Sequence, residues 1–109
     1  SASDIVILTE TWLNSSIHDS EIFCSHADWN IFRHDRETRR GGGVLIAIKK
    51  NIPCFDVRLL DCNIEISAVC LSTPSNKIIL AVCYRPPDCD SLFAVNLSSI
   101  LVDIKTRFP

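Results

Sequence analysis

The stretch IEISAVCLSTPSNKIILAVCY, residues 64–84, contains two apolar runs separated by the polar tetrapeptide 73–76. In the first run every second residue from Ile64 to Cys70 is apolar, so these side chains share one face of a strand. The tetrapeptide contains Pro74 and Asn76, two residue types that favour tight turns. The segment therefore predicts an antiparallel hairpin with strands over 64–71 and 77–84.

Outward from this hairpin, the pattern predicts further short strands and two helices. Apolar, β-branched runs predict buried strands, and we expect the run Ile5–Leu8 to be covered on both faces. After Pro86 and Pro87 the apolar spacing changes to helical intervals, with Asp90 and Ser91 as candidate N-caps. The expected elements are strands 5–8, 29–33, 44–48 and 55–59, a short helix near 20–24 and a helix over 92–107. Consecutive strands with flanking helices predict the α+β fold class.

Length and composition fit one globular domain. The 109 residues are 47% hydrophobic and 22% charged, and the net charge of −2 gives no global sign of a polyanion binder. No apolar run approaches the roughly 20 residues that a membrane helix needs, and the first residues do not resemble a secretory signal. We therefore expect an intracellular protein with no membrane partner. The six cysteines form no C-x-x-C pair and are expected to be reduced and structural.

Three segments, in order, resemble motifs of the endonuclease/exonuclease/phosphatase superfamily. Residues 4–13 (DIVILTETWL) are similar to its strand ending in Glu-Thr, and the Trp-Leu is typical of the branch found in non-LTR (LINE-like) retrotransposons. Residues 41–48 (GGGVLIAI) resemble its glycine-rich strand start, and residues 82–87 (VCYRPP) resemble its Tyr-Arg-Pro-Pro motif. The resemblance covers essentially the whole chain. It implies a partial four-layered α/β sandwich of mostly antiparallel sheets flanked by helices, with residues 1–109 as an incomplete domain.

The resemblance also implies roles for three residues. Glu10 would bind a divalent metal, Mg²⁺ or Mn²⁺, because a hard cation takes carboxylate oxygens and keeps several waters; the alternative is a solvated or capping carboxylate. Tyr84 would act beside the scissile phosphate as a catalytic hydroxyl, and the alternative is an aromatic ring packed over the helix with its hydroxyl in water. Arg85 would contact the DNA backbone or, alternatively, a surface carboxylate.

Four arginines lie within eight residues: Arg33, Arg36, Arg39 and Arg40. They could bind backbone phosphates, and we take Arg39 and Arg40 as candidate substrate-binding residues. Because Asp35 and Glu37 interleave, a solvated charged loop is the alternative. The glycines at 41–43 are not a phosphate-binding loop, since no Gly-Lys-Ser/Thr follows them. They are expected to permit a tight turn and a close backbone approach.

The remaining catalytic groups of the family do not occur in this chain. It lacks the Asn of the first motif, the Gly-Asp-Phe-Asn strand, the later Asp and the Ser-Asp-His motif, and the histidines His18, His26 and His34 are expected on the surface. The resemblance thus implies a fragment of a Mg²⁺-dependent DNA endonuclease, nicking a target for retrotransposition and inactive alone. Alternatives are a phosphatase or phosphodiesterase of the superfamily, or a non-catalytic retrotransposon remnant acting as an interaction module. Implied partners are DNA, the remainder of the domain and a downstream reverse transcriptase domain, at a nuclear site of action.

An incomplete domain also has a structural consequence. Without the next core strand, the helix over 92–107 is expected to be partly uncovered and a sheet edge to be unpaired. Such an edge exposes backbone groups that can pair with another chain.

Overall fold

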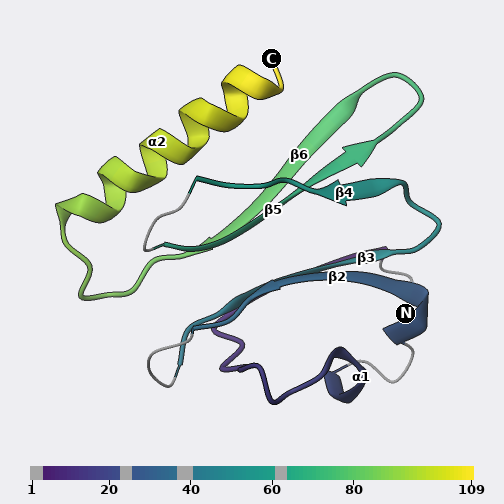
Figure 1. Ribbon diagram of the computed structural model, residues 1–109, viewed down its shortest axis with the longest axis horizontal. Helices are drawn as coiled ribbons and strands as arrows, with labels where there is room; N and C mark the ends of the chain where they lie inside the picture. The colour runs from purple at the N-terminus through teal and green to yellow at the C-terminus, as the bar shows by residue number, and fades with distance from the viewer. Residues whose placement is uncertain (1–3, 23–25, 37–40, 61–63) are drawn as a thin grey trace.

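In the computed structural model, which describes residues 4–22, 26–36, 41–60 and 64–109, two three-stranded antiparallel sheets accompany one long helix (Figure 1). Along the chain the elements are β1 (Ile5–Thr9), α1 (Asp19–Ile22), the 3-10 helix η1 (His26–Asp28), β2 (Trp29–His34), β3 (Val44–Lys49), β4 (Cys54–Asp56), β5 (Glu65–Ser72), β6 (Lys77–Tyr84) and α2 (Ser91–Arg107). The protein is therefore of the α+β class, as the order of strand and helix patterns in the sequence predicted.

The hairpin predicted for residues 64–84 is confirmed. Strands β5 and β6 pair antiparallel along their whole length, with Glu65 opposite Tyr84 at the open end. At the closed end, the N–H of Thr73 donates to the carbonyl of Asn76 over 2.8 Å. The hairpin register brings Glu65 beside a residue that the sequence marked as functional.

Strand β4 completes this sheet in the order β4-β5-β6. It is shorter than the predicted strand 55–59, since it begins at Cys54 and ends at Asp56. After Asp56 the pairing continues through one bond, from the N–H of Val57 to the carbonyl of Ala68 over 2.9 Å. The predicted boundaries are therefore wrong at both ends, because strand length depends on the partner strand as well as on local composition.

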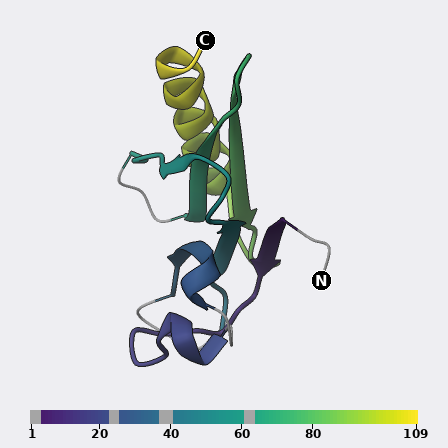
Figure 2. The ribbon, with the colours of Figure 1, turned by 90° about the vertical axis from the view of Figure 1, so that its right-hand side faces the viewer.

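The second sheet has the order β1-β3-β2. Residues 44–48 of the central strand β3 are fully buried, as expected of a strand covered on both faces. β1 lies at the edge of the sheet and pairs with β3 (Figure 2). Its side chains Ile5, Ile7 and Leu8 are 36%, 42% and 42% exposed, so the prediction that this strand is covered on both faces is wrong. An apolar run does not by itself distinguish a central strand from an edge strand, because long-range pairing sets that position.

Helix α2 begins where the sequence predicted a cap. The Asp90 side chain accepts a hydrogen bond from the N–H of Leu92 over 3.0 Å, which satisfies one of the first N–H groups of the helix. The predicted span 92–107 is confirmed to within one residue. Helix α1 is a single turn, and the last residues of the predicted helix 20–24 lie outside the described residues.

Two apolar clusters hold the layers together. One lies between α2 and the β4-β5-β6 sheet and includes Ile66, Cys70 and Ile100. The other lies between the two sheets and includes Ile46 and Val69. Alternate residues of β5 thus enter opposite clusters, and the β4-β5-β6 sheet lies between α2 and the other sheet (Figure 1).

The outer face of α2 is apolar and exposed. Leu92, Val95, Leu101 and Val102 are between 49% and 65% exposed, which confirms that the helix is partly uncovered. Among the described residues, no helix combines the length and hydropathy that a membrane-spanning segment requires.

Candidate functional site

The two residues that the resemblance singled out most strongly, Glu10 and Tyr84, lie together. Glu10 follows β1 in one sheet and Tyr84 is the last residue of β6 in the other. The Tyr84 hydroxyl donates a hydrogen bond to Oε1 of Glu10 over 3.0 Å, across 74 positions of sequence. The Tyr84 hydroxyl is thus bound to a carboxylate, and the Glu10 carboxylate is exposed at a strand end.

The backbone after β1 adopts an uncommon conformation. Glu10 has φ of 50° and Trp12 has φ of 58°, in the left-handed region that side chains disfavour. The Trp12 N–H donates to the carbonyl of Gly42 over 2.9 Å, and the Thr11 N–H donates to that of Gly43 over 3.4 Å. Such strained residues persist only where surrounding contacts hold them, and they concentrate at functional sites. The glycine loop therefore fixes the backbone that carries Glu10.

The glycine loop 41–43 matches the expectation of a tight turn and a close approach. All three glycines have positive φ, and Gly42 has φ of 62°. A Cβ atom at Gly42 would clash with the carboxylate of Glu65 and the guanidinium of Arg36. Glycine is required here both for its backbone conformation and for the space that it leaves.

An ion pair between Glu65 and Arg36 lies next to this loop. Oε1 of Glu65 accepts from Nε of Arg36 over 3.0 Å, and Oε2 accepts from Nη2 over 2.9 Å. The N–H of Gly43 also donates to Oε1 over 2.9 Å. Burial raises the pKa of Glu65, but these hydrogen bonds outweigh it and bring the pKa below its ordinary value of 4.5. The sequence interpretation missed this pair.

Tyr84 is linked to the same ion pair. The guanidinium carbon of Arg36 lies 5.9 Å from the centroid of the Tyr84 ring, within the range of a cation–π contact. The hydrogen bond to Glu10 raises the pKa of Tyr84 above its ordinary value of 10.0, because a phenolate there would face a carboxylate. The Tyr84 hydroxyl is therefore a neutral donor at pH 7.

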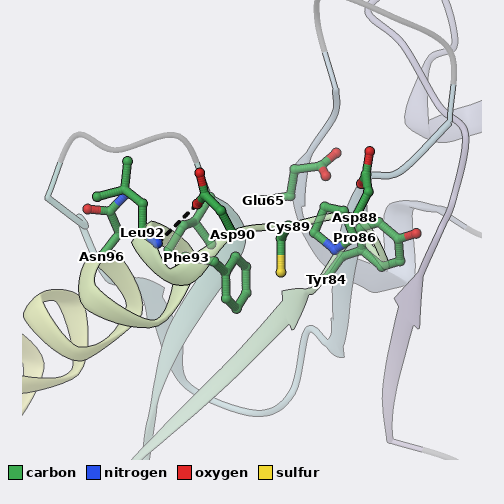
Figure 3. Close-up of a pocket in the computed structure, with 10 residues that line it drawn as sticks. Glu65, Tyr84, Pro86, Asp88, Cys89, Asp90, Leu92, Phe93 and Asn96 are labelled. Carbon is green, nitrogen blue, oxygen red and sulfur yellow. Dashed lines mark hydrogen bonds between the residues drawn. The ribbon is translucent and has the colours of Figure 1, made fainter.

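A hollow of about 300 Å³ opens between the end of β6 and the start of α2 (Figure 3). Its walls include Glu65, Tyr84, Asp88, Cys89, Phe93 and Asn96. Asp88 and Asp90 leave the hollow with negative charge, while Glu65 is balanced by Arg36. A phosphate would approach such a site favourably only together with a cation.

Of the three arginines proposed for substrate binding, Arg85 lies within the described residues. Nε of Arg85 lies 3.2 Å from Sγ of Cys89, and its guanidinium lies 6.0 Å from the centroid of the Phe93 ring. Arg85 therefore turns toward the start of α2 and contacts two residues, Cys89 and Phe93, that line the hollow. Arg39 and Arg40 lie outside the described residues, and their proposed role stays a prediction.

Arg33 and Arg36 do not belong to a solvated charged loop, so that interpretation is wrong for both. Arg33 binds Asp35 over 2.7 Å and Asp19 over 3.0 Å, and its side chain is 14% exposed. Arg36 is 15% exposed in its pair with Glu65. Carboxylates therefore hold both guanidinium groups within the fold. The histidines at 18 and 34 are exposed, as expected.

Glu10 is the candidate metal ligand among the described residues. No group of three or more His, Cys, Asp or Glu side chains gathers among them to hold a metal ion. Glu10 is one exposed carboxylate at a strand end. One carboxylate is compatible with Mg²⁺, which usually keeps several waters and binds substrate phosphates alongside one or two protein ligands.

No protein-family model, curated protein or solved structure matches this chain.

Proposed function

We propose that this chain is part of a Mg²⁺-dependent DNA endonuclease that hydrolyses a phosphodiester bond. The observation that carries the proposal is the hydrogen bond between Tyr84 and Glu10, two residues from separate motifs of the resemblance. A structural role alone would not require a strand-end carboxylate and a phenol from different sheets to meet at an exposed position. The strained backbone at Glu10 adds support, because such strain concentrates at functional sites.

In this proposal Glu10 and Tyr84 have separate tasks. Glu10 would be the carboxylate ligand of Mg²⁺, which when bound would stabilise the negative charge on the scissile phosphate. Tyr84 would turn its hydroxyl from Glu10 to a phosphate oxygen and donate a hydrogen bond there. The raised pKa of Tyr84 suits this task, since only the neutral phenol can donate.

The proposed reaction needs groups beyond those described. Water must be oriented and deprotonated, and the leaving oxygen must be stabilised. The described residues offer no cluster of carboxylates and histidines for these tasks. We therefore propose that the rest of the domain supplies them, and that the 109 residues alone do not cleave DNA.

We also propose the finer fold that the resemblance implies, a partial four-layered α/β sandwich. Support comes from the apolar cluster between the two sheets and from the packing of α2 against the outer face of the β4-β5-β6 sheet. The exposed side chains of β1 and α2 are then the surfaces that the remainder of the domain would cover.

A nicking assay tests the proposed activity. Supercoiled plasmid would be incubated with Mg²⁺ and either this chain or the chain extended by the remainder of its reading frame. We expect nicking by the extended protein, and a fall of roughly 100-fold in Glu10→Gln and in Tyr84→Phe. Glu21→Gln, which changes another exposed carboxylate, is the control and should nick normally. Full activity of Glu10→Gln would overturn the proposal.

A second candidate is a non-catalytic interaction module derived from a retrotransposon. The absence of a three-residue metal cluster among the described residues favours it. The same assay discriminates the two candidates. If the protein is an interaction module, neither this chain nor the extended chain should nick the plasmid, with or without Mg²⁺. A phosphatase of the superfamily would instead release phosphate from a small monoester, and a phosphodiesterase would hydrolyse a small diester to a monoester; both would leave the plasmid intact.

A further inference from the structure

We propose that the ion pair between Glu65 and Arg36, termed the positioning pair, fixes the geometry of the two proposed site residues. Those residues are Glu10 and Tyr84, so the role of the pair rests on the proposed function. The pair itself need not touch a substrate. It acts through the glycine loop on one side and through an aromatic ring on the other.

Three observations indicate that the positioning pair is rigid. Arg36 and Glu65 form a two-bond fork of 3.0 and 2.9 Å, which fixes the planes of both groups as well as their distance. Their side chains are only 15% and 14% exposed, so solvent competes weakly for the bonds. Glu65 is also the first residue of β5, at the end of a strand buried on both faces.

The route from the pair to Glu10 runs through the glycine loop. Oε1 of Glu65 receives the Gly43 N–H over 2.9 Å, which fixes the orientation of that peptide group. The carbonyls of the same loop then receive the N–H groups of Thr11 and Trp12, over 3.4 and 2.9 Å. Since Thr11 directly follows Glu10, these bonds determine where the Glu10 side chain leaves the backbone.

The route from the pair to Tyr84 is shorter. Glu65 and Tyr84 are directly opposite each other in the β5–β6 register, and both line the hollow (Figure 3). The guanidinium of Arg36 lies 5.9 Å from the centroid of the Tyr84 ring, within the range of a cation–π contact. The same pair therefore constrains both partners of the hydrogen bond between Tyr84 and Glu10.

A merely structural role and a positioning role make different predictions. A structural pair stabilises the fold, and its loss leaves the hydrogen bond between Glu10 and Tyr84 intact in the molecules that stay folded. A positioning pair is coupled to that hydrogen bond, so its loss weakens the bond within the folded state. The coupling is measurable as a failure of additivity between substitutions in the pair and at Glu10.

Tyr84 provides the readout because it is the only tyrosine in the chain. Its pKa can be measured directly from the ultraviolet absorbance of the phenolate, without metal or DNA. Two variants disturb the pair: Glu65→Gln removes one charge, and Arg36→Lys retains its charge but loses the planar fork. Each is measured with Glu10 present and in the Glu10→Gln background, after circular dichroism has established that the protein is folded.

The expected result is that each variant lowers the pKa of Tyr84 by more when Glu10 is present than in the Glu10→Gln background. The lowering of the Tyr84 pKa with Glu10 present should exceed the lowering in the Glu10→Gln background by roughly 0.4 or more. Arg36→Lys is decisive, because its unchanged charge leaves little direct effect on Tyr84, and it also serves if Glu65→Gln does not fold. Purely additive effects in the folded variants would overturn the proposal.

A matched control is the ion pair of Arg33 with Asp35, which has similar burial at 14% and 16% exposure. Arg33 instead contacts Asp19 and the carbonyl of Asn14, so Asp35→Asn should leave the pKa of Tyr84 unchanged in both backgrounds. The titration tests the positioning role, whereas the nicking assay tests the proposed nuclease activity, so each experiment can reject one proposal without the other. Non-additive titration without nicking would retain the positioning role and reject the nuclease, whereas nicking with additive titration would do the reverse.

Discussion

The hydroxyl of Tyr84 donates a hydrogen bond of 3.0 Å to the carboxylate of Glu10, although the residues are 74 positions apart. The bond joins the end of one sheet to the end of the other. It links a side chain of the segment 4–13 with one of the segment 82–87, two of the three segments that carry the resemblance.

Glu10→Gln should lower the pKa of Tyr84 toward 10.0, because the neighbouring carboxylate holds it above that value. In the native protein the raised pKa contributes stability that is complete below pH 10.0 and is lost as the pH rises through the folded-state pKa. Titration of the phenolate absorbance measures the change. Glu21→Gln, at an exposed carboxylate elsewhere, should give the wild-type curve. An unchanged pKa in Glu10→Gln would contradict the assigned cause.

Glu65→Gln should reduce the stability of the fold in a pH-dependent way. The pKa of Glu65 lies below 4.5, so its contribution is complete above about pH 4.5 and is lost as the pH falls through the lowered pKa. We expect a loss of roughly 1–3 kcal/mol in the free energy of unfolding at pH 7, typical of hydrogen bonds to charged groups. Urea unfolding at pH 7 and pH 3 measures it, and the difference from wild type should narrow at pH 3. An equal loss of stability in Glu65→Gln at pH 7 and at pH 3 would be inconsistent with stabilisation by the charged form of Glu65.

Gly42→Ala should destabilise the glycine loop by roughly 2–3 kcal/mol, because a methyl group adds both backbone strain and a steric conflict. The φ of 62° disfavours a side chain, and the new Cβ would meet Glu65 and Arg36. Urea unfolding monitored by circular dichroism measures the loss. Ser75→Ala, in the exposed hairpin turn, is the control and should change stability by about 0.5 kcal/mol or less. Wild-type stability of Gly42→Ala would show that the loop relaxes without cost.

Ile100→Ala should cost roughly 2–5 kcal/mol, because it opens a cavity between α2 and the β4-β5-β6 sheet. The Ile100 side chain is 1% exposed in that cluster. Val102→Ala, two residues along the same helix, removes a side chain that is 65% exposed and should change stability by about 0.5 kcal/mol or less. Thermal or urea unfolding of the two variants compares them directly. Equal losses would mean that the exposed face of α2 is covered by a partner in solution.

The elements that the sequence predicted best depend on local patterns. The hairpin over 64–84 follows from period-two alternation around a turn, and the start of α2 follows from helical spacing after the Asp90 cap. Each of these signals is contained in about 20 consecutive residues. Strand β4 was less well predicted, because the alternation of residues 55–59 does not set its length, which depends on pairing with β5.

The candidate site was predicted only in part. The resemblance pointed to Glu10 and Tyr84, and the fold brings them into contact. It gave no role to Glu65, although a carboxylate at the start of an apolar strand, opposite Tyr84 in the hairpin register, was an available signal. Arg36 was grouped with its charged neighbours, because nothing local indicates a partner 29 residues away.

By itself, the sequence determined the hairpin over 64–84, where α2 begins and that glycine must occupy the loop before β3, because periodicity, capping and backbone freedom are properties of neighbouring residues. Only the tertiary structure decided that Ile5–Leu8 is an edge strand and that Arg36 pairs with Glu65. It also decided that Glu10 meets Tyr84. These outcomes depend on how two sheets pack through a shared apolar cluster, and that packing couples residues whose separation in sequence carries no local signal.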